Sequence, residues 1–129
     1  MARKRSVPLT EAEQRLMEIL WDLQSASVSN IVAAMPPQGR PANNSVQTIM
    51  TILEDKGYVR HRVQGRTFIY SPVVARDDAA RTALSYVTTR FFGGSSAQAA
   101  LNLIGDESLT DADLDELRRR IDEAKRGAR

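Results

Sequence analysis

The chain has 129 residues, of which 42% are hydrophobic and 5% aromatic, and this predicts one small folded domain or a domain with an appendage, built on an aliphatic core. It has no cysteine and no apolar run long enough to span a bilayer, which excludes disulfides, thiolate metal sites and membrane insertion and suits a cytoplasmic protein without a signal peptide. The net charge is only +2, but the basic excess lies within residues 1–74.

Two helices are expected in the first 36 residues. The Arg3-Lys4-Arg5 cluster before them fits a solvated tail and a phosphate-binding arm equally well. Thr10 and Glu13 form a capping box, so a helix is predicted over about residues 11–23. Its expected buried stripe is Ala12, Leu16, Ile19, Leu20 and Leu23, with Met17 and Trp21 outside it. Ser27 is the expected cap of a second helix that Pro36-Pro37 stops, with apolar positions at Val28, Ile31, Val32 and Met35.

A third helix is predicted from Asn43, as N-cap, to Gly57, as the terminating glycine. Val46, Ile49, Met50 and Leu53 fall at i, i+3, i+4 and i+7 and form its apolar face. The opposite face holds Asn44, Gln47, Thr48, Thr51 and Asp55. Amides and hydroxyls can donate and accept hydrogen bonds in the plane of a base pair, so this face is a candidate for reading DNA. By itself it fits an ordinary polar surface equally well.

Two β-rich runs, residues 58–64 and 67–71, flank the turn residues Gly65-Arg66 and predict a hairpin that Pro72 closes. Three helices followed by a hairpin are the order of a winged helix, in which helices two and three form a helix-turn-helix and the third helix enters the major groove. The hairpin arginines are candidates for contacts with the DNA backbone, as is one arginine in the loop before the third helix. These candidates are Arg60, Arg62, Arg66 and Arg40. A polar helix followed by a basic hairpin favours DNA binding over the plain polar surface.

Residues 75–129 predict three short amphipathic helices: Asp77 or Asp78 is the expected cap of the first, the second starts at residues 95–98, and Thr110 begins the capping sequence of the third. Three such helices cannot bury much by themselves, so we expect a second copy of the chain to cover them; folding back on the first domain is the alternative. The candidate dimer residues are Leu84, Val87, Phe91, Leu101, Ile104, Leu114, Leu117 and Ile121. The expected fold class is mostly α with a small β-hairpin, divided into a DNA-binding domain (1–74) and a helical dimerisation domain (75–129).

Nothing in the sequence resembles an active site, and no cofactor or metal is expected. His61 is the only histidine, and it lies between two arginines. Asp111, Asp113 and Asp115 resemble the start of a calcium loop, but Glu116 stands where that loop requires glycine. The sequence therefore argues against an enzyme.

From Leu9 to about Ala124 the chain resembles the penicillinase-repressor and methicillin-resistance-repressor family of winged-helix proteins. Five blocks, in order and spacing, carry the resemblance: residues 9–13 with 17–21, 29–32, 45–53 with 56–59, 68–72, and 91–95. The resemblance implies a homodimeric transcriptional repressor that binds twofold-symmetric operators with half-sites of the TACA/TGTA kind. The genes it implies are those for β-lactamase or cell-wall stress. By position, the base-facing residues are Asn44, Ser45, Gln47, Thr48 and Thr51.

Family members often carry Lys or Arg at the positions of Asn44 and Gln47, so the neutral amides here should weaken contacts with phosphate or guanine. In antibiotic-sensing members a membrane metalloprotease sensor leads, directly or indirectly, to cleavage between Asn and Phe in the C-terminal domain. Asn102-Leu103 matches that position, with Leu in place of Phe. Related copper-responsive repressors use C-terminal cysteines, which this chain lacks. Two other classes stay open: a protein-interaction module and a small-molecule sensor. For the sensor, Trp21, Tyr86 and Phe92 would be the residues to watch for fluorescence changes on ligand addition.

Overall fold

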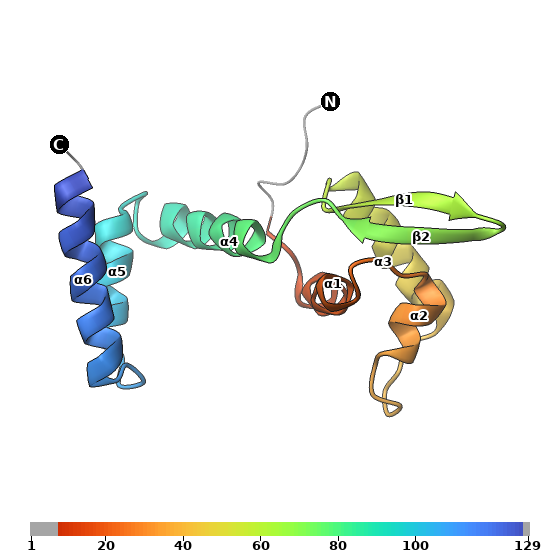
Figure 1. Cartoon of the computed structure of the whole chain (residues 1–129), viewed down its shortest axis with the longest axis horizontal. Helices are drawn as coiled ribbons and strands as arrows, with labels where there is room; N and C mark the ends of the chain where they lie inside the picture. Colours follow the sequence, from red (N-terminus) through yellow and green to blue (C-terminus); the bar gives the residue numbers. More distant parts are fainter. Residues whose placement is uncertain (1–7, 128–129) are drawn as a thin grey trace. The chain divides into compact units, whose positions relative to one another are not determined.

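The structure is a computed structural model that describes residues 8–127, so the Arg3-Lys4-Arg5 cluster lies outside the described residues (Figure 1). The elements in chain order are α1 (Glu11–Leu23), α2 (Val28–Ala33), α3 (Asn43–Asp55), β1 (Val59–Gln64), β2 (Thr67–Pro72), α4 (Arg76–Phe91), α5 (Ser96–Ile104) and α6 (Asp111–Gly127). This order confirms the expected fold class, a mostly helical chain with a winged helix at its start. Residues up to Val87 form one compact unit and those from Thr88 onward form a second. The functional division after residue 74 stays a prediction.

The first two helices begin at the capping boxes that the sequence contains. Thr10 Oγ1 accepts the backbone N–H of Glu13 at 3.1 Å, and Glu13 Oε1 accepts the N–H of Thr10 at 2.9 Å. At α2 the same exchange joins Ser27 and Asn30 at 3.1 and 3.2 Å. Two orphan N–H groups are satisfied at each helix start, so both boundaries are fixed by residues three apart.

The start of α3 differs from the expectation. The N-cap is Ala42, without a side-chain cap, and Asn43 is the first helical residue, so the prediction of Asn43 as the cap was wrong. Asn43 Nδ2 instead donates to Ser29 Oγ at 3.3 Å. The side chain that could cap α3 thus connects it to α2, the preceding helix of the helix-turn-helix.

The end of α3 follows the sequence. Gly57 has φ +87°, its N–H bonds to the carbonyl of Glu54 at 3.0 Å, and the N–H of Tyr58 bonds to the carbonyl of Leu53 at 3.0 Å. This pair of bonds is the Schellman motif, which requires a left-handed residue and therefore favours glycine. It leads the chain directly into β1, which pairs antiparallel with β2 around the two-residue loop Gly65-Arg66.

The core of the first unit lies between α1, α2, α3 and the base of the hairpin. Leu16, Met17, Leu20 and Trp21 form the buried stripe of α1 together with Glu13, whereas Ala12 and Leu23 are exposed. The expected stripe was therefore right for Leu16 and Leu20, with Ile19 partly buried against the core, and wrong at its edge, where Met17 and Trp21 are buried in place of Ala12 and Leu23. The reason is that α1 is covered by α2, α3 and β2, so that the side facing them, rather than the most evenly spaced apolar set, is buried.

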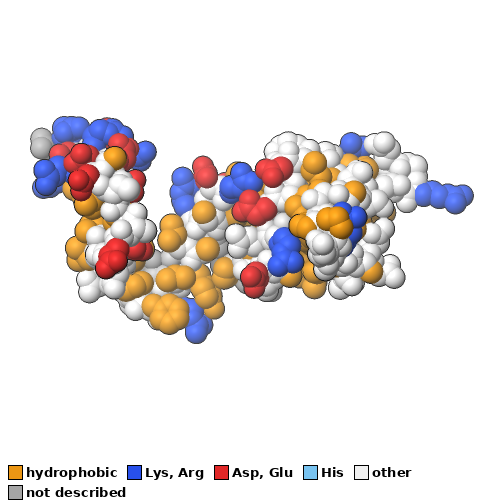
Figure 2. Space-filling model, turned by 90° about the horizontal axis from the view of Figure 1, so that it is seen from below, with side chains coloured by type: hydrophobic (Ala, Val, Ile, Leu, Met, Phe, Trp, Pro, Cys, Tyr) orange, Lys and Arg blue, Asp and Glu red, His pale blue; other side chains and the backbone are white. Residues whose placement is uncertain are grey.

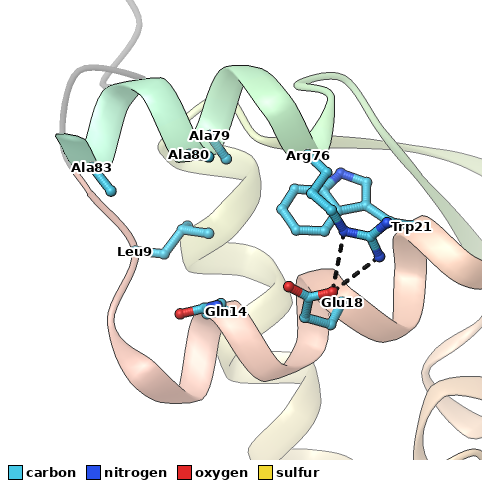
Figure 3. A pocket seen from close by; sticks show the side chains of 8 residues that line it. All are labelled: Leu9, Gln14, Glu18, Trp21, Arg76, Ala79, Ala80 and Ala83. Atoms are coloured by element: carbon cyan, nitrogen blue, oxygen red, sulfur yellow. Dashed lines mark hydrogen bonds and ion pairs between the residues drawn. The ribbon is translucent and has the colours of Figure 1, made fainter. Parts of the chain in front are cut away.

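The start of α4 packs on α1 within the first unit (Figure 3). Ala79 is its buried residue, and Trp21 Nε1 donates to the carbonyl of Val74 at 2.9 Å just before the helix. Arg76 lies over the Trp21 ring, 5.2 Å from its centroid, and its Nη2 is 2.9 Å from Glu18 Oε1. Because α4 already begins at Arg76, Asp77 and Asp78 lie in its first turn and neither is its cap, contrary to the expectation.

The second unit contains the end of α4, α5 and α6. The last two helices begin where the sequence predicts. Ser95 caps α5, its Oγ accepting the N–H of Gln98, and Thr110 caps α6 as expected, exchanging two bonds with Asp113. No residue from Thr88 to Gly127 is buried, and Figure 2 shows hydrophobic side chains uncovered on the surface of this unit. Across the described part of the chain, no helix combines the length and the apolar character needed to cross a membrane.

Candidate nucleic-acid interface

The outward face of α3 is polar and free of lysine and arginine. Asn44, Thr48 and Thr51 are exposed along one line of the helix, and Ser45 is exposed on its flank. The opposite side, with Val46, Met50 and Leu53 fully buried, is fixed against the core. The packing of α3 therefore presents four of the five predicted base-facing residues to solvent; the fifth, Gln47, is half-buried.

The two threonines are oriented by the helix itself. Thr48 Oγ1 donates to the carbonyl of Asn44 at 3.1 Å, and Thr51 Oγ1 donates to the carbonyl of Gln47 at 3.0 Å. These bonds to the preceding turn use the hydroxyl hydrogens and leave each oxygen as an acceptor beside an exposed methyl group. Such a pair suits the exocyclic amino group of adenine or cytosine and the methyl group of thymine.

Gln47 points toward the hairpin. Its Nε2 donates to the hydroxyl of Tyr70, on β2, at 2.7 Å. The bond leaves the second N–H of the amide and its oxygen unused by Tyr70. Reasoning from the sequence missed Tyr70; the period-2 alternation of β2 places it on the same face as Phe68, and that alternation was the available signal.

A hollow of about 320 Å³ adjoins Gln47. It lies between the beginning of α2, α3 and the tip of the hairpin, and Ser27, Ser29, Arg66 and Thr67 contribute to its lining. Hydroxyls and one guanidinium are the groups that proteins use to hold phosphate oxygens. The structure thus brings Arg66 together with the predicted base-facing helix.

Arg60 and Arg62 lie on the other face of the hairpin. His61, between them, is 2.8 Å from Glu54 of α3 through its Nδ1 and stacks on Phe68, so the face of β1 that carries His61 is the one toward α3. Neighbouring residues of a strand point to opposite faces, and the two arginines therefore point away from α3. The structure separates them from Arg66, with which the sequence grouped them.

Arg40 contacts the end of α2. Its Nη2 donates to the carbonyls of Ala33, at 3.4 Å, and Met35. These are carbonyls that the short helix and its exit turn leave without intrahelical partners, and a cation is favoured there by the helix dipole. The guanidinium predicted to contact the DNA backbone is thus engaged with the protein's own backbone.

Comparison with known proteins identifies the family. Residues 9–123 match the model of the penicillinase repressor family. The chain belongs to the penicillinase repressor family. This repressor is 23% identical to the penicillinase repressor of Bacillus licheniformis, over 95% of each chain. It is 25% identical to the methicillin resistance regulatory protein MecI of Staphylococcus aureus (strain N315), over 88% of this chain and 93% of that one. The family consists of transcriptional repressors and not of enzymes, which confirms both expectations.

Solved structures also resemble this repressor over about half its length. The DNA-binding domain of the repressor BlaI has a TM-score of 0.49 and 24% identity, covering 54% of this chain and 85% of that one. The CopR repressor has a TM-score of 0.45 and 28% identity, covering 53% of this chain and 99% of that one. A monomeric form of Bacillus licheniformis BlaI, solved in complex with the blaP half-operator, has a TM-score of 0.47 and 24% identity, covering 56% and 88%.

The predicted dimer residues of this repressor are exposed in the single chain. Leu84 and Val87 belong to the first unit, and the others belong to the second. Phe91 and Leu101 are exposed by 72% and 63%, and Leu117 by 38%. Among the described residues from Thr88 to Gly127 none is buried, so the predicted dimer residues of the second unit are open to solvent in the single chain.

The predicted cleavage position lies in the second half of α5. Asn102 and Leu103 are both exposed, and Asn102 Nδ2 donates to the carbonyl of Gln98 at 3.1 Å. The peptide bond between them is therefore helical.

A small hollow lies between α1 and the start of α4 (Figure 3). Its volume is about 130 Å³, and Leu9, Trp21 and Ala83 line its apolar part. Pockets for drug-sized ligands are roughly 300–1,000 Å³. This hollow is therefore smaller than a pocket for a drug-sized ligand.

Proposed function

We propose that this repressor works as a homodimer that places α3 of each copy in the major groove of a twofold-symmetric operator. The observation that carries the proposal is the outward face of α3, with Asn44, Thr48 and Thr51 exposed beside a hollow that holds Arg66. The side chains on the helix have the chemistry for base edges, and the arginine has the chemistry for phosphates. Ser45 and Gln47 complete the proposed reading face.

A second copy is the proposed cover for the C-terminal helices. Apolar side chains as exposed as Phe91 and Leu101 favour association, because covering each fully is worth roughly 1.5–3 kcal/mol. Two linked DNA-binding units would bind an operator far more tightly than one, since the second contact becomes intramolecular. Twofold symmetry of the dimer then predicts twofold symmetry of the operator.

Induction is proposed to follow cleavage between Asn102 and Leu103. The exposure of both residues and the sparse packing of α5 support this position. A cut there would separate α6 from the DNA-binding unit, and the two copies would then bind their half-sites independently and weakly. The proposed trigger is a membrane sensor metalloprotease, acting directly or indirectly on the repressor in the cytoplasm. The proposed targets are genes for β-lactamase or cell-wall stress.

A DNase footprint on the DNA upstream of the protein's own gene, at near-physiological salt, tests this function. The expected result is a protected site with twofold symmetry, whose protection requires much more protein when Leu117 is replaced by Asp. The matched control is Leu23→Asp, since Leu23 is also an exposed leucine but lies on α1. Protection without symmetry, or equal effects of the two variants, would contradict the dimer. If the folded protein protects no sequence there or in a random duplex pool, and its binding shows no dependence on salt, the protein-interaction module replaces the proposal.

A further inference from the structure

We infer that Tyr70 is a positioning residue for sequence recognition, because its hydroxyl holds the amide of Gln47 in the orientation that reads a base. The inference rests on the proposed function and adds a residue that does not itself lie on the reading helix. The bond from Gln47 Nε2 to Tyr70 Oη is 2.7 Å long and joins α3 to β2.

The position of the Tyr70 hydroxyl is set by the core. The side chain is 1% exposed, and the backbone N–H and carbonyl of Tyr70 bond to Ala26, before α2, at 2.8 and 3.0 Å. Its ring lies 5.6 Å from the ring of His61 and 6.3 Å from that of Phe68, measured between centroids. A hydroxyl held by these backbone bonds and ring contacts cannot follow a flexible partner, so the partner must adjust to it.

Gln47 is the conformationally flexible partner in this hydrogen bond. A glutamine side chain has several rotatable bonds, and fixing them at an interface costs conformational entropy. Here that ordering has already taken place in the free protein. The half-buried base of the side chain and its bond to Tyr70 restrict the amide to the side of α3 that adjoins Arg66.

The direction of this hydrogen bond determines which atoms of the Gln47 amide remain free to bind a base. One Nε2 hydrogen is given to Tyr70, and the other hydrogen and Oε1 are left for a ligand. Adenine presents an acceptor, N7, and a donor, the N6 amino group, on its major-groove edge. The remaining hydrogen and oxygen of Gln47 match that pair, so Tyr70 orients the amide for adenine without occupying both of its functions.

The alternative to an orienting role is a purely structural one, in which the bond to Tyr70 keeps Gln47 away from DNA. The two roles differ in what a variant without the hydroxyl does. If the bond orients a reading residue, its loss lowers the preference at one base pair and leaves binding to random duplex unchanged. If the bond only stabilises the fold, its loss affects all sequences alike or none.

The test is a selection from a randomised duplex pool, performed with the unaltered 129-residue chain, Tyr70→Phe, Gln47→Ala and the double variant. Loss of one orienting bond should remove part of a bidentate contact that is itself worth roughly 10- to 100-fold. We expect Tyr70→Phe to lower the adenine preference at one base pair by about three- to tenfold. Gln47→Ala should remove that preference, and the double variant should equal Gln47→Ala, because Tyr70 acts only through Gln47.

A second variant disturbs the same bond without touching the core. Gln47→Asn keeps the amide but shortens the side chain by one methylene, so that it cannot reach Tyr70 from the same backbone position. It should lower the adenine preference at that base pair by at least as much as Tyr70→Phe does. Full retention of the preference by Tyr70→Phe or Gln47→Asn, or equal losses on selected and random duplex, would overturn the inference. An unaltered protein that selects no sequence would overturn the proposed function as well, and that outcome is distinct from the first two.

Discussion

Lys56, at the end of α3, lies 2.7 Å through its Nζ from the carboxylate Oε1 of Glu13, in the first turn of α1. The two residues are 43 positions apart, and Glu13 is 5% exposed. The same oxygen of Glu13 accepts the backbone N–H of Thr10. One carboxylate therefore caps α1 and attaches the proposed reading helix to it.

Replacing Glu13 by Gln should destabilise the first unit by about 1–3 kcal/mol. Glutamine can still accept the N–H of Thr10, because it suits the same capping box, but it leaves Lys56 without its charged partner. Urea unfolding measures the decrease in stability. Glu11→Gln removes the same charge from the same turn at an exposed position, and an equal decrease in that control would assign the effect to the helix dipole instead.

The stability of the protein should decline in acid for the same reason. Burial disfavours the charged form of Glu13, but the hydrogen bonds from Lys56 and Thr10 and the nearby charge of Lys56 outweigh it and lower the pKa of Glu13 below its ordinary value of 4.5. A lowered folded-state pKa stabilises the fold above 4.5, and that stabilisation disappears as the pH falls through the folded-state pKa. Unfolding free energies measured from about pH 3 to about pH 7 should therefore rise with pH. The rise should be smaller in Glu13→Gln, and identical pH profiles would contradict this account.

Arg66→Ala should weaken binding to all duplex sequences and reduce the slope of log affinity against log salt by about 0.9 for each phosphate that Arg66 neutralises. Arg66 lines the hollow beside α3, whereas Arg60 and Arg62 are on the far face of the hairpin. Arg60→Ala and Arg62→Ala are therefore the matched controls, and we expect smaller changes in slope from them. Affinity titrations at several salt concentrations measure all three. Equal slopes for the three variants would show that both faces of the hairpin contact DNA.

Arg40→Ala should act on stability and not on the salt slope. Its guanidinium bonds carbonyls at the end of α2, and removing hydrogen bonds from a charged donor costs roughly 1.5–3 kcal/mol, less where solvent replaces it. Arg40→Lys keeps the charge near the helix end but cannot reproduce the fork of the guanidinium. Thermal unfolding and the salt titration, performed on both variants, separate the two roles. A lower slope with unchanged stability would assign Arg40 to the DNA backbone.

Leu117→Asp should raise the dissociation constant of the dimer by at least about tenfold, because a buried leucine side chain contributes roughly 1.5–3 kcal/mol. Sedimentation equilibrium over a range of protein concentrations measures it. Val63→Asp, an exposed apolar residue of the hairpin outside the predicted dimer set, is the control and should leave the constant unchanged. A monomeric unaltered protein at micromolar concentration would contradict the proposed dimer.

The sequence by itself determined the features that depend on residues a few positions apart. The capping box of Thr10 with Glu13, the Ser27 cap of α2, the glycine that ends α3 and the two-residue turn of the hairpin all form as predicted. Each is a local hydrogen-bonding or backbone requirement, satisfied by neighbours in the chain.

Only the tertiary structure decided which surfaces those elements cover. It selected Met17 and Trp21 for the buried stripe of α1, because three elements pack on that side. It assigned Arg40 to a helix end, placed Arg60 and Arg62 away from α3, and brought Tyr70 to Gln47 across 23 residues. Such contacts depend on how elements far apart in sequence meet, and helical or strand periodicity specifies a face without specifying its partner.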